Sequence, residues 1–237
     1  MSYGIKLHVW GDFACFTRPE MKAERVSYDV ITPSAARGIL EAIYWKPQIR
    51  WVIDRVHVLK PVRFTSIRRN EVGKKMTGPS QAMMNGAPGT LLLIIEDERQ
   101  QRAALILRDV AYLIEAHFEI LDFRFEKGGA ELPARDCEGK HLDMFNRRAR
   151  DGQYFHHPYF GTREFPVSFT LIEDNAPLPA SELPADQRDK DFGFMLHDIE
   201  FNQDPRTKKV RSTIPRFFRA EMRKGIIEVP PFYQARG

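Results

Sequence analysis

The sequence predicts an α+β protein in two parts, on the strength of three observations. Residues 1–173 pass through strand-like and helix-like patterns in the order strand, helix, strands, helix, strand. Residues 173–193 are rich in Pro, Asp and Ala, which indicates a linker or an exposed loop. Three short strand-like segments within residues 194–232 then predict a small antiparallel sheet.

The element order of the first part is the split βαβ pattern of a ferredoxin-like or RRM-like domain. We therefore expect a modified ferredoxin-like/RRM-like N-terminal domain over residues 1–173. Residues 174–237 are expected to form a linker and a small antiparallel β-sheet C-terminal domain.

The first two elements have clear local signals. Residues 5–11 alternate apolar and polar side chains, as a half-buried strand does. Residues 32–47 predict a helix, because Thr32 can cap it, Pro33 suits its first turn and Pro47 follows its end. The predicted buried stripe of this helix consists of Ala36, Ile39, Leu40 and Ile43.

The next segments predict further strands around one basic loop. Residues 49–67 are β-branched and aromatic and predict a long strand bent at Pro61. Gly, Pro and Asn punctuate residues 68–89, which indicates a basic, mobile loop. Residues 90–97 are almost continuously apolar, as a central strand is, and residues 103–123 predict one or two more strands.

The first part is expected to end with a short helix and a strand. Residues 140–153 predict the helix and residues 163–173 the strand, while Phe155 and Phe165 are expected to belong to the core. One stripe of the predicted helix carries Leu142, Phe145 and Ala149.

Composition indicates a globular protein that contacts polyanions. The chain has 237 residues, 43% of them apolar, and a net charge of +4. Basic residues gather in segments 55–75, 146–153 and 206–224, which fits either nucleic acid binding or ordinary solvated surfaces. Aromatic and His residues between these cations favour nucleic acid.

Other features bear on the compartment. The sequence contains no apolar run of membrane-spanning length, and its start lacks the pattern of a signal peptide, so we expect no membrane association. Cys15 and Cys137 form no pair-spacing motif, which fits a reducing cytoplasm.

Three stretches of this sequence resemble one known family. Residues 11–47 include Ile43-Tyr44-Trp45-Lys46-Pro47, residues 138–169 open on Glu-Gly-Lys-His and carry Arg-Arg and Gly-Thr-Arg-Glu-Phe, and residues 110–120 lie between them. Together they resemble the type I-C (Dvulg subtype) branch of the CRISPR-associated Cas family five, over roughly residues 3 to 170.

The resemblance implies a function and partners. Members of this branch cut the repeat hairpin of CRISPR precursor RNA without a metal ion or other cofactor, and remain on the 5′ handle of the crRNA. They do so as a subunit of the type I-C Cascade complex, beside backbone Cas family seven and large Cas family eight subunits; DNA is left open as a further ligand. The alternative is an inert subunit that only holds the handle.

The resemblance also implies site residues. It places Tyr44 in the active site and assigns His117, in the strand before the Gly-Lys-His motif, as general acid or base with Tyr44 as its partner. The family's lysine close to that histidine is missing, and Lys140 and His141 are the candidates to replace it, at the expected start of a helix. Arg68 and Arg69 could also reach the site.

The cations expected to bind RNA lie in three segments. Arg147, Arg148 and Arg150 are expected to contact phosphates, and the aromatic turn after them is expected to supply stacking side chains. The full expected set is Arg68, Arg69, Lys74, Lys75, Arg147, Arg148, Arg150 and Arg163. No metal ligand set is expected.

Overall fold

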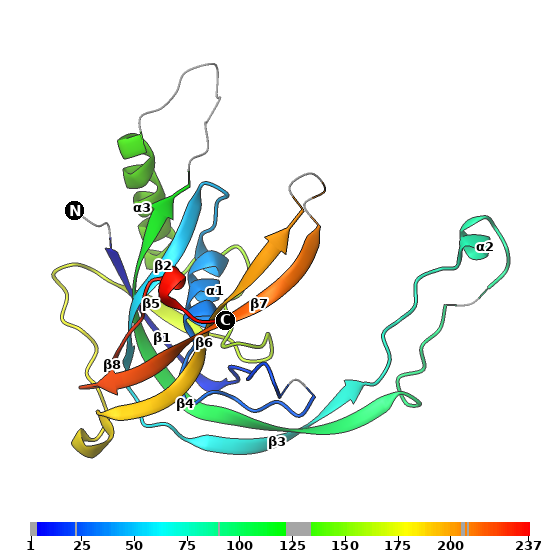
Figure 1. Ribbon diagram of the computed structural model, residues 1–237, viewed down its shortest axis with the longest axis horizontal. Coiled ribbons are helices and arrows are strands. Elements are labelled where there is room, and N and C mark those ends of the chain that lie inside the picture. Colours follow the sequence, from blue (N-terminus) through cyan, green and yellow to red (C-terminus); the bar gives the residue numbers. More distant parts are fainter. Residues whose placement is uncertain (1–3, 22, 90, 122–133, 205–206, 208) are drawn as a thin grey trace.

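The computed structural model describes residues 4–21, 23–89, 91–121, 134–204, 207 and 209–237 (Figure 1). Its helices are α1 (Pro33–Ile43), α2 (Gln81–Met84) and α3 (Ala134–Arg150), with 3₁₀ turns at Ala185–Gln187 and Phe232–Gln234. Its strands are β1 (Gly4–Ala14), β2 (Ile49–Val58), β3 (Phe64–Val72), β4 (Arg99–Ile120), β5 (Ser168–Ile172), β6 (Lys190–Gln203), β7 (Val210–Arg223) and β8 (Ile226–Glu228).

The first part of the chain has the predicted ferredoxin-like arrangement. Strands β5, β1, β4 and β2 lie side by side in that order, each antiparallel to its neighbour. Helix α1 connects β1 to β2, and α3 connects β4 to β5. Apart from β3 and the short α2, which lie between β2 and β4, the order is therefore βαββαβ. The predicted α+β class, with its mostly antiparallel sheet, is confirmed.

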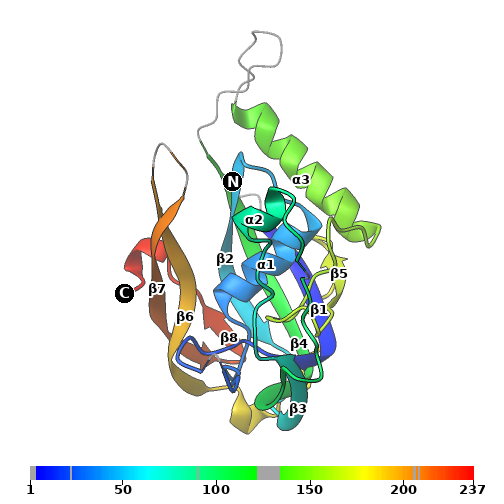
Figure 2. The ribbon, with the colours of Figure 1, turned by 90° about the vertical axis from the view of Figure 1, so that its right-hand side faces the viewer.

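The C-terminal strands continue the same sheet. β8 pairs with Arg55, Val56 and His57 of β2, and β7 and β6 follow outside it. The hairpin of β6 and β7 stands beside α1 (Figure 2), where Arg37 of α1 forms an ion pair with Asp198 of β6 at 2.9 Å. A boundary between two domains at residues 173–174 stays a prediction.

The local signals explain the elements around the site. Alternate residues of β1 are buried, with Leu7 and Val9 fully inaccessible. The Thr32 hydroxyl accepts a hydrogen bond from the Ala35 amide at 3.2 Å, which satisfies a free donor in the first turn of α1. All four residues of the predicted stripe of α1 are buried.

Several boundaries differ from the expectations, and those around β3 differ most. The expected strand 49–67 is two strands, because the chain leaves the sheet between Val58 and Phe64, around Pro61. β3 then continues to Val72, so Arg68 and Arg69 are strand residues rather than loop residues.

One expected strand is wrong, and the end of another lies outside the described part. Residues 91–98 hold no strand, and Leu92 is 72% exposed, because no neighbouring strand covers this apolar run. The run belongs to a long projection formed by the outer part of β3, the start of β4 and the connection between them, described at residues 68–89 and 91–103, which we call the arm (Figure 1). The last two residues of expected strand 103–123 lie outside the described residues.

Candidate functional site

The candidate site begins with a buried pair formed by Tyr44 and His141. The phenol oxygen of Tyr44 lies 2.8 Å from Nδ1 of His141, and the two rings are 5.9 Å apart. Only 4% of Tyr44 and 7% of His141 are exposed, so the pair lies just beneath the surface. Residues nearly a hundred positions apart in the chain therefore share one hydrogen bond, which neither helix requires for its own formation.

The two elements that carry this pair are locked together. Tyr44 is the first extended residue after α1, and its carbonyl accepts a hydrogen bond from Nε1 of Trp51 at 2.9 Å. Trp51 also packs against Phe145, one turn after His141, with ring centroids 4.8 Å apart. Arg148 donates to the Ile43 carbonyl at 3.0 Å. These contacts fix the end of α1 against the middle of α3.

The surroundings keep both members of the pair uncharged near neutral pH. Burial lowers the pKa of His141 below its usual value of 6.5, and the positive charges of Lys140 and Lys46 lower it further. Burial raises the pKa of the Tyr44 phenol, against the opposing effect of Arg148. A neutral imidazole can accept a proton, which suits His141 to work as a base.

Cations surround the pair on the exposed side. Lys46 and Lys140 are exposed, and neither makes an ion pair with any residue that the structure describes. The guanidinium of Arg148 lies 5.4 Å from the centre of the Tyr44 ring. The buried pair therefore lies under a positively charged surface that can attract a phosphate.

His117 lies on the other face of the sheet. Its neighbours along β4, Ala116 and Phe118, are buried in the main core on the side of the helices, and the Phe118 ring lies 6.2 Å from His141. Alternation directs His117 away from that side, where its Nδ1 lies 2.9 Å from the Asp54 carboxylate. The predicted pairing of His117 with Tyr44 is therefore wrong, and His141 takes its place.

The expected helix start at Lys140 is also wrong. α3 begins at Ala134, so Lys140 and His141 lie within the helix, where backbone amides are already bonded. Any phosphate at Lys140 would meet its ammonium group and not free backbone amides.

The three α3 cations that were expected to bind RNA make different contacts in the structure. Arg147 is exposed and contacts only the Met144 sulfur among the described residues, at 3.2 Å. Arg148 is half-buried and bonded to α1, as described above. Arg150 forms an ion pair with Glu173 at 2.8 Å.

The remaining expected cations make no hydrogen bond or ion pair with Tyr44 or His141 in the described part of the chain. Arg68 is exposed on β3, whereas Arg69 is largely buried and bonded to Glu71 and Glu164. Lys74 forms an ion pair with Glu98, and Lys75 lines a hollow of the arm. Arg163 lines a hollow beside His156 and His157.

Comparisons with known proteins identify the family of this chain. The family model described as "CRISPR-associated protein (Cas_Cas5)" matches residues 4–230. The chain belongs to this Cas5 family. The resemblance to Cas family five that the motifs indicated is thus confirmed.

Two curated relatives of this Cas5 chain carry the same name, "CRISPR pre-crRNA endoribonuclease Cas5d". The relative from Mannheimia succiniciproducens is 54% identical over 235 residues, which is 98% of this chain and 97% of the relative. The relative from Thermus thermophilus is 41% identical over 237 residues, which is 95% of this chain and 91% of the relative.

Two solved structures share the fold. They are titled a crystal structure of a CRISPR-associated protein and a functionally uncharacterized protein from Streptococcus mutans. Each has a TM-score of 0.63 and 23% identity, and covers 99% of this chain and 95% of its own.

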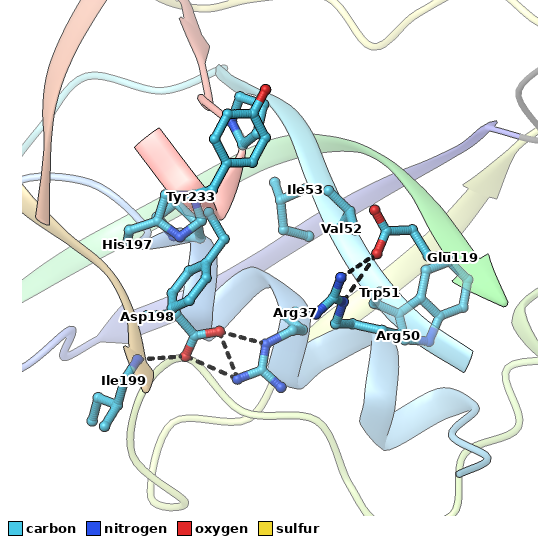
Figure 3. Close-up of a pocket in the computed structure, with 13 residues that line it drawn as sticks. Arg37, Arg50, Trp51, Val52, Ile53, Glu119, His197, Asp198, Ile199 and Tyr233 are labelled. Atoms are coloured by element: carbon cyan, nitrogen blue, oxygen red, sulfur yellow. Dashed lines mark hydrogen bonds and ion pairs between the residues drawn. The ribbon is translucent and has the colours of Figure 1, made fainter. Parts of the chain in front are cut away.

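A separate hollow of the Cas5 chain holds charges that are already paired (Figure 3). It has a volume of about 440 Å³ and lies between β2, the start of α1, β6 and the turn at Phe232–Gln234. Arg37 binds Asp198 and Glu41, and Arg50 binds Glu119 at 3.0 Å. Because each guanidinium there has a carboxylate partner, this hollow has little charge to offer a phosphate.

Sequence reasoning missed Lys46, and it did not pair Tyr44 with His141 although both were candidates. Lys46 was visible only as part of the Ile-Tyr-Trp-Lys-Pro motif. The partner had a signal: His141, Phe145 and Ala149 are spaced four residues apart, so a histidine lies on the buried stripe of the helix.

Metal ligands, cysteines and membrane-spanning helices can be checked in the described part of the chain. No group of three or more His, Cys, Asp or Glu side chains there is arranged to hold a metal ion. Cys15 is free and buried, and the side chain of Cys137 lies outside the description. No described helix has both the length and the apolar character needed to cross a membrane.

Proposed function

We propose that this chain is a metal-independent endoribonuclease that cleaves CRISPR precursor RNA within its repeats and then holds the 5′ handle of the crRNA in the type I-C Cascade complex. The observation that carries the proposal is the neutral Tyr44–His141 pair under the cations Lys46 and Lys140. Support for the substrate comes from two relatives named as pre-crRNA endoribonucleases, which match nearly the whole chain.

The proposed reaction needs only groups that this site offers. The ribose 2′-OH attacks the adjacent phosphorus, so a P–O2′ bond forms and the P–O5′ bond breaks. The products are a 2′,3′-cyclic phosphate and a free 5′-OH. The protein must take a proton from the 2′-OH, return one to the leaving 5′ oxygen, and stabilise the extra negative charge of the phosphorane.

His141 suits the first of these tasks. When its Nδ1–H is donated to the Tyr44 oxygen, Nε2 of the neutral ring is left to accept the 2′-OH proton. Tyr44 is then a positioning residue, because it fixes the tautomer and the orientation of the ring. Lys46 and Lys140 suit the other tasks, since an ammonium group both stabilises a phosphorane and donates a proton.

Incubating the chain with its own repeat RNA in EDTA tests the proposal. A product with a 2′,3′-cyclic phosphate and a 5′-OH supports the nuclease. Bound but intact RNA supports the alternative, an inert handle-binding subunit. RNA that is neither bound nor cut excludes both.

The pH dependence of cleavage should reveal the environment of His141. Protonation removes the base, so the rate should fall on the acidic side with a midpoint below 6.5, because burial and the two lysines lower the pKa of His141. Lys140→Gln removes one of these positive charges and should move the midpoint to higher pH. Single-turnover rates across the mildly acidic range measure both effects.

Lys75→Gln on the arm is the matched control for this measurement. It removes the same charge far from the pair, and should leave the midpoint where it is. A midpoint in Lys140→Gln that matches the parental one would exclude an electrostatic effect of Lys140 on the base.

Arg147 is the cation of α3 that we propose as a phosphate contact. Arg147→Ala should weaken RNA binding and lower the slope of log affinity against log salt by about 0.7, the value for one phosphate contact on a single strand. Arg150→Ala makes the same change on the same helix, but Glu173 already neutralises that charge, so its slope should change less. If the slope of log affinity against log salt is the same in Arg147→Ala as in the parent, the last turn of α3 does not contact the RNA.

The proposed Cascade partners are backbone Cas family seven and large Cas family eight subunits. The arm supports contact with a protein, because its described connection exposes the apolar side chains of Met76, Met84, Leu92 and Ile95 to between 55% and 72%. We propose the arm as the surface for a backbone subunit.

A further inference from the structure

Three large aromatic side chains are exposed where α1 ends. Trp45 is 55% exposed, Tyr154 45% and Phe155 84%, and we call these three residues the aromatic platform. Trp45 directly follows Tyr44, and the Phe155 amide donates to the Ala42 carbonyl at 2.8 Å. Phe155 was expected in the core; that expectation is wrong, whereas Phe165 is buried as expected.

The backbone that carries the platform is held in place by hydrogen bonds. Gly152 ends α3 with a positive φ of 66°, a conformation that favours glycine. The Gln153 amide then donates to the Arg148 carbonyl at 2.8 Å, before Phe155 reaches α1. The exposed Phe155 ring therefore projects from a segment anchored to both helices of the Tyr44–His141 site.

The charges around the platform suit a polyanion. Lys46 directly follows Trp45, Arg147 lies in the last turn of α3 before Tyr154 and Phe155, and Lys140 lowers the pKa of His141 on the same helix. All three cations are exposed, and none has an ion-pair partner within the described part of the chain. The hollow of Figure 3 differs, because the guanidinium groups that line it together with the exposed Tyr233 are neutralised by carboxylates. Aromatic rings with free cations form the combination that binds single-stranded nucleic acid.

We infer that the aromatic platform stacks against unpaired bases next to the scissile phosphate, so that the cleaved bond lies in or beside single-stranded RNA. This inference rests on the proposed function and adds the class of nucleotide that the site takes. Stacking suits this position, because every base offers an aromatic face whatever its identity. A bound base on Phe155 would also hold the neighbouring ribose near His141, which is the positioning that phosphoryl transfer needs.

The test is a double-mutant cycle, in which the loss of one protein ring is combined with the loss of one RNA base and binding is measured. The RNA is a repeat that carries a 2′-deoxy nucleotide at the cut position, so that native protein binds it without cleavage, and a second series replaces each base flanking the cut by an abasic residue. Phe155→Ala and Trp45→Ala should each weaken binding about tenfold, within the range measured for one stacked base. Phe155→Tyr and Trp45→Phe keep a ring and should bind as the parent does.

The abasic RNA decides between stacking and other roles. One flanking abasic position should weaken binding to the parent by a similar factor, and should cause no further loss in the variant that lacks the matching ring. The inference would be overturned if the losses of affinity from the ring deletion and from the abasic position were additive. It would also be overturned if neither change altered the affinity. If Phe155→Ala binds RNA normally but no longer binds a Cascade subunit, the platform is a surface for a protein partner. That result would also overturn the inference.

The same experiments separate this inference from the proposed function. Tyr233→Ala removes an exposed ring outside the platform and should leave binding unchanged. If ring and base prove coupled but unmodified repeat RNA is never cut, the nuclease proposal fails and the platform stands. If cleavage is normal and no coupling exists, the platform fails alone.

Discussion

His141→Ala should lower the single-turnover rate of repeat RNA cleavage by about 10²–10⁴-fold, the range that one general acid or base supplies. The reason is that the proton of the 2′-OH then has no acceptor at the site. RNA affinity should stay close to the parental value, because the exposed cations around the pair are unchanged. Denaturing gels measure the rate, and filter binding measures the affinity.

His117→Ala is the matched control for this prediction. It removes the same imidazole from the other face of the sheet, where Asp54 is its partner, and should change the cleavage rate by less than about twofold. A large loss of rate in His117→Ala with full activity in His141→Ala would reverse our assignment. That result would also require a substrate path on the open face of the sheet.

The His141 variant needs a check on its fold. Removing the buried imidazole leaves the Tyr44 hydroxyl without its partner, which costs roughly 1–3 kcal/mol of stability. His141→Asn can keep a hydrogen bond to that hydroxyl, yet its amide cannot act as a base. A stable but inactive His141→Asn separates catalysis from folding.

Sequence patterns predicted most of the fold because local and tertiary requirements agree there. The alternation of β1 and the capped helix after Thr32 each favour the local backbone conformation and also bury the apolar side chains of that element in the core. The apolar run within residues 90–97 failed as a predictor for the opposite reason. Its side chains have the composition of a central strand, but the described part of the run lies on the exposed arm, where the chain supplies no neighbouring strand.

The site was predicted only in part because sequence distance hides which face a residue occupies. Tyr44 and His141 were both candidates, but the resemblance paired Tyr44 with His117. One step along β4 moves a side chain from the core face to the other face, and Phe118, not His117, points toward the pair. The four-residue spacing of His141 and Phe145 was the better guide, since it places the histidine on the packed side of α3.

Phe145→Ala should lower the free energy of unfolding by about 3–5 kcal/mol, the usual cost of deleting a fully buried phenyl ring. Phe145 is 0% exposed and packs against Trp51, so the cavity opens between α3 and the sheet. That loss is a large share of the roughly 5–15 kcal/mol that keeps a domain folded. Urea or thermal unfolding followed by circular dichroism measures it.

Asn146→Ala changes the next residue on the half-exposed side of α3 and should cost less than about 0.5 kcal/mol. The cleavage rate should also depend on this packing. Trp51 packs against Phe145 and donates a hydrogen bond to the Tyr44 carbonyl, so losing Phe145 loosens the support of Tyr44. Folded Phe145→Ala should therefore cut RNA more slowly than folded Asn146→Ala. A variant that loses under 1 kcal/mol of stability and cuts at the parental rate would show that the contact between Trp51 and Phe145 does not position the pair.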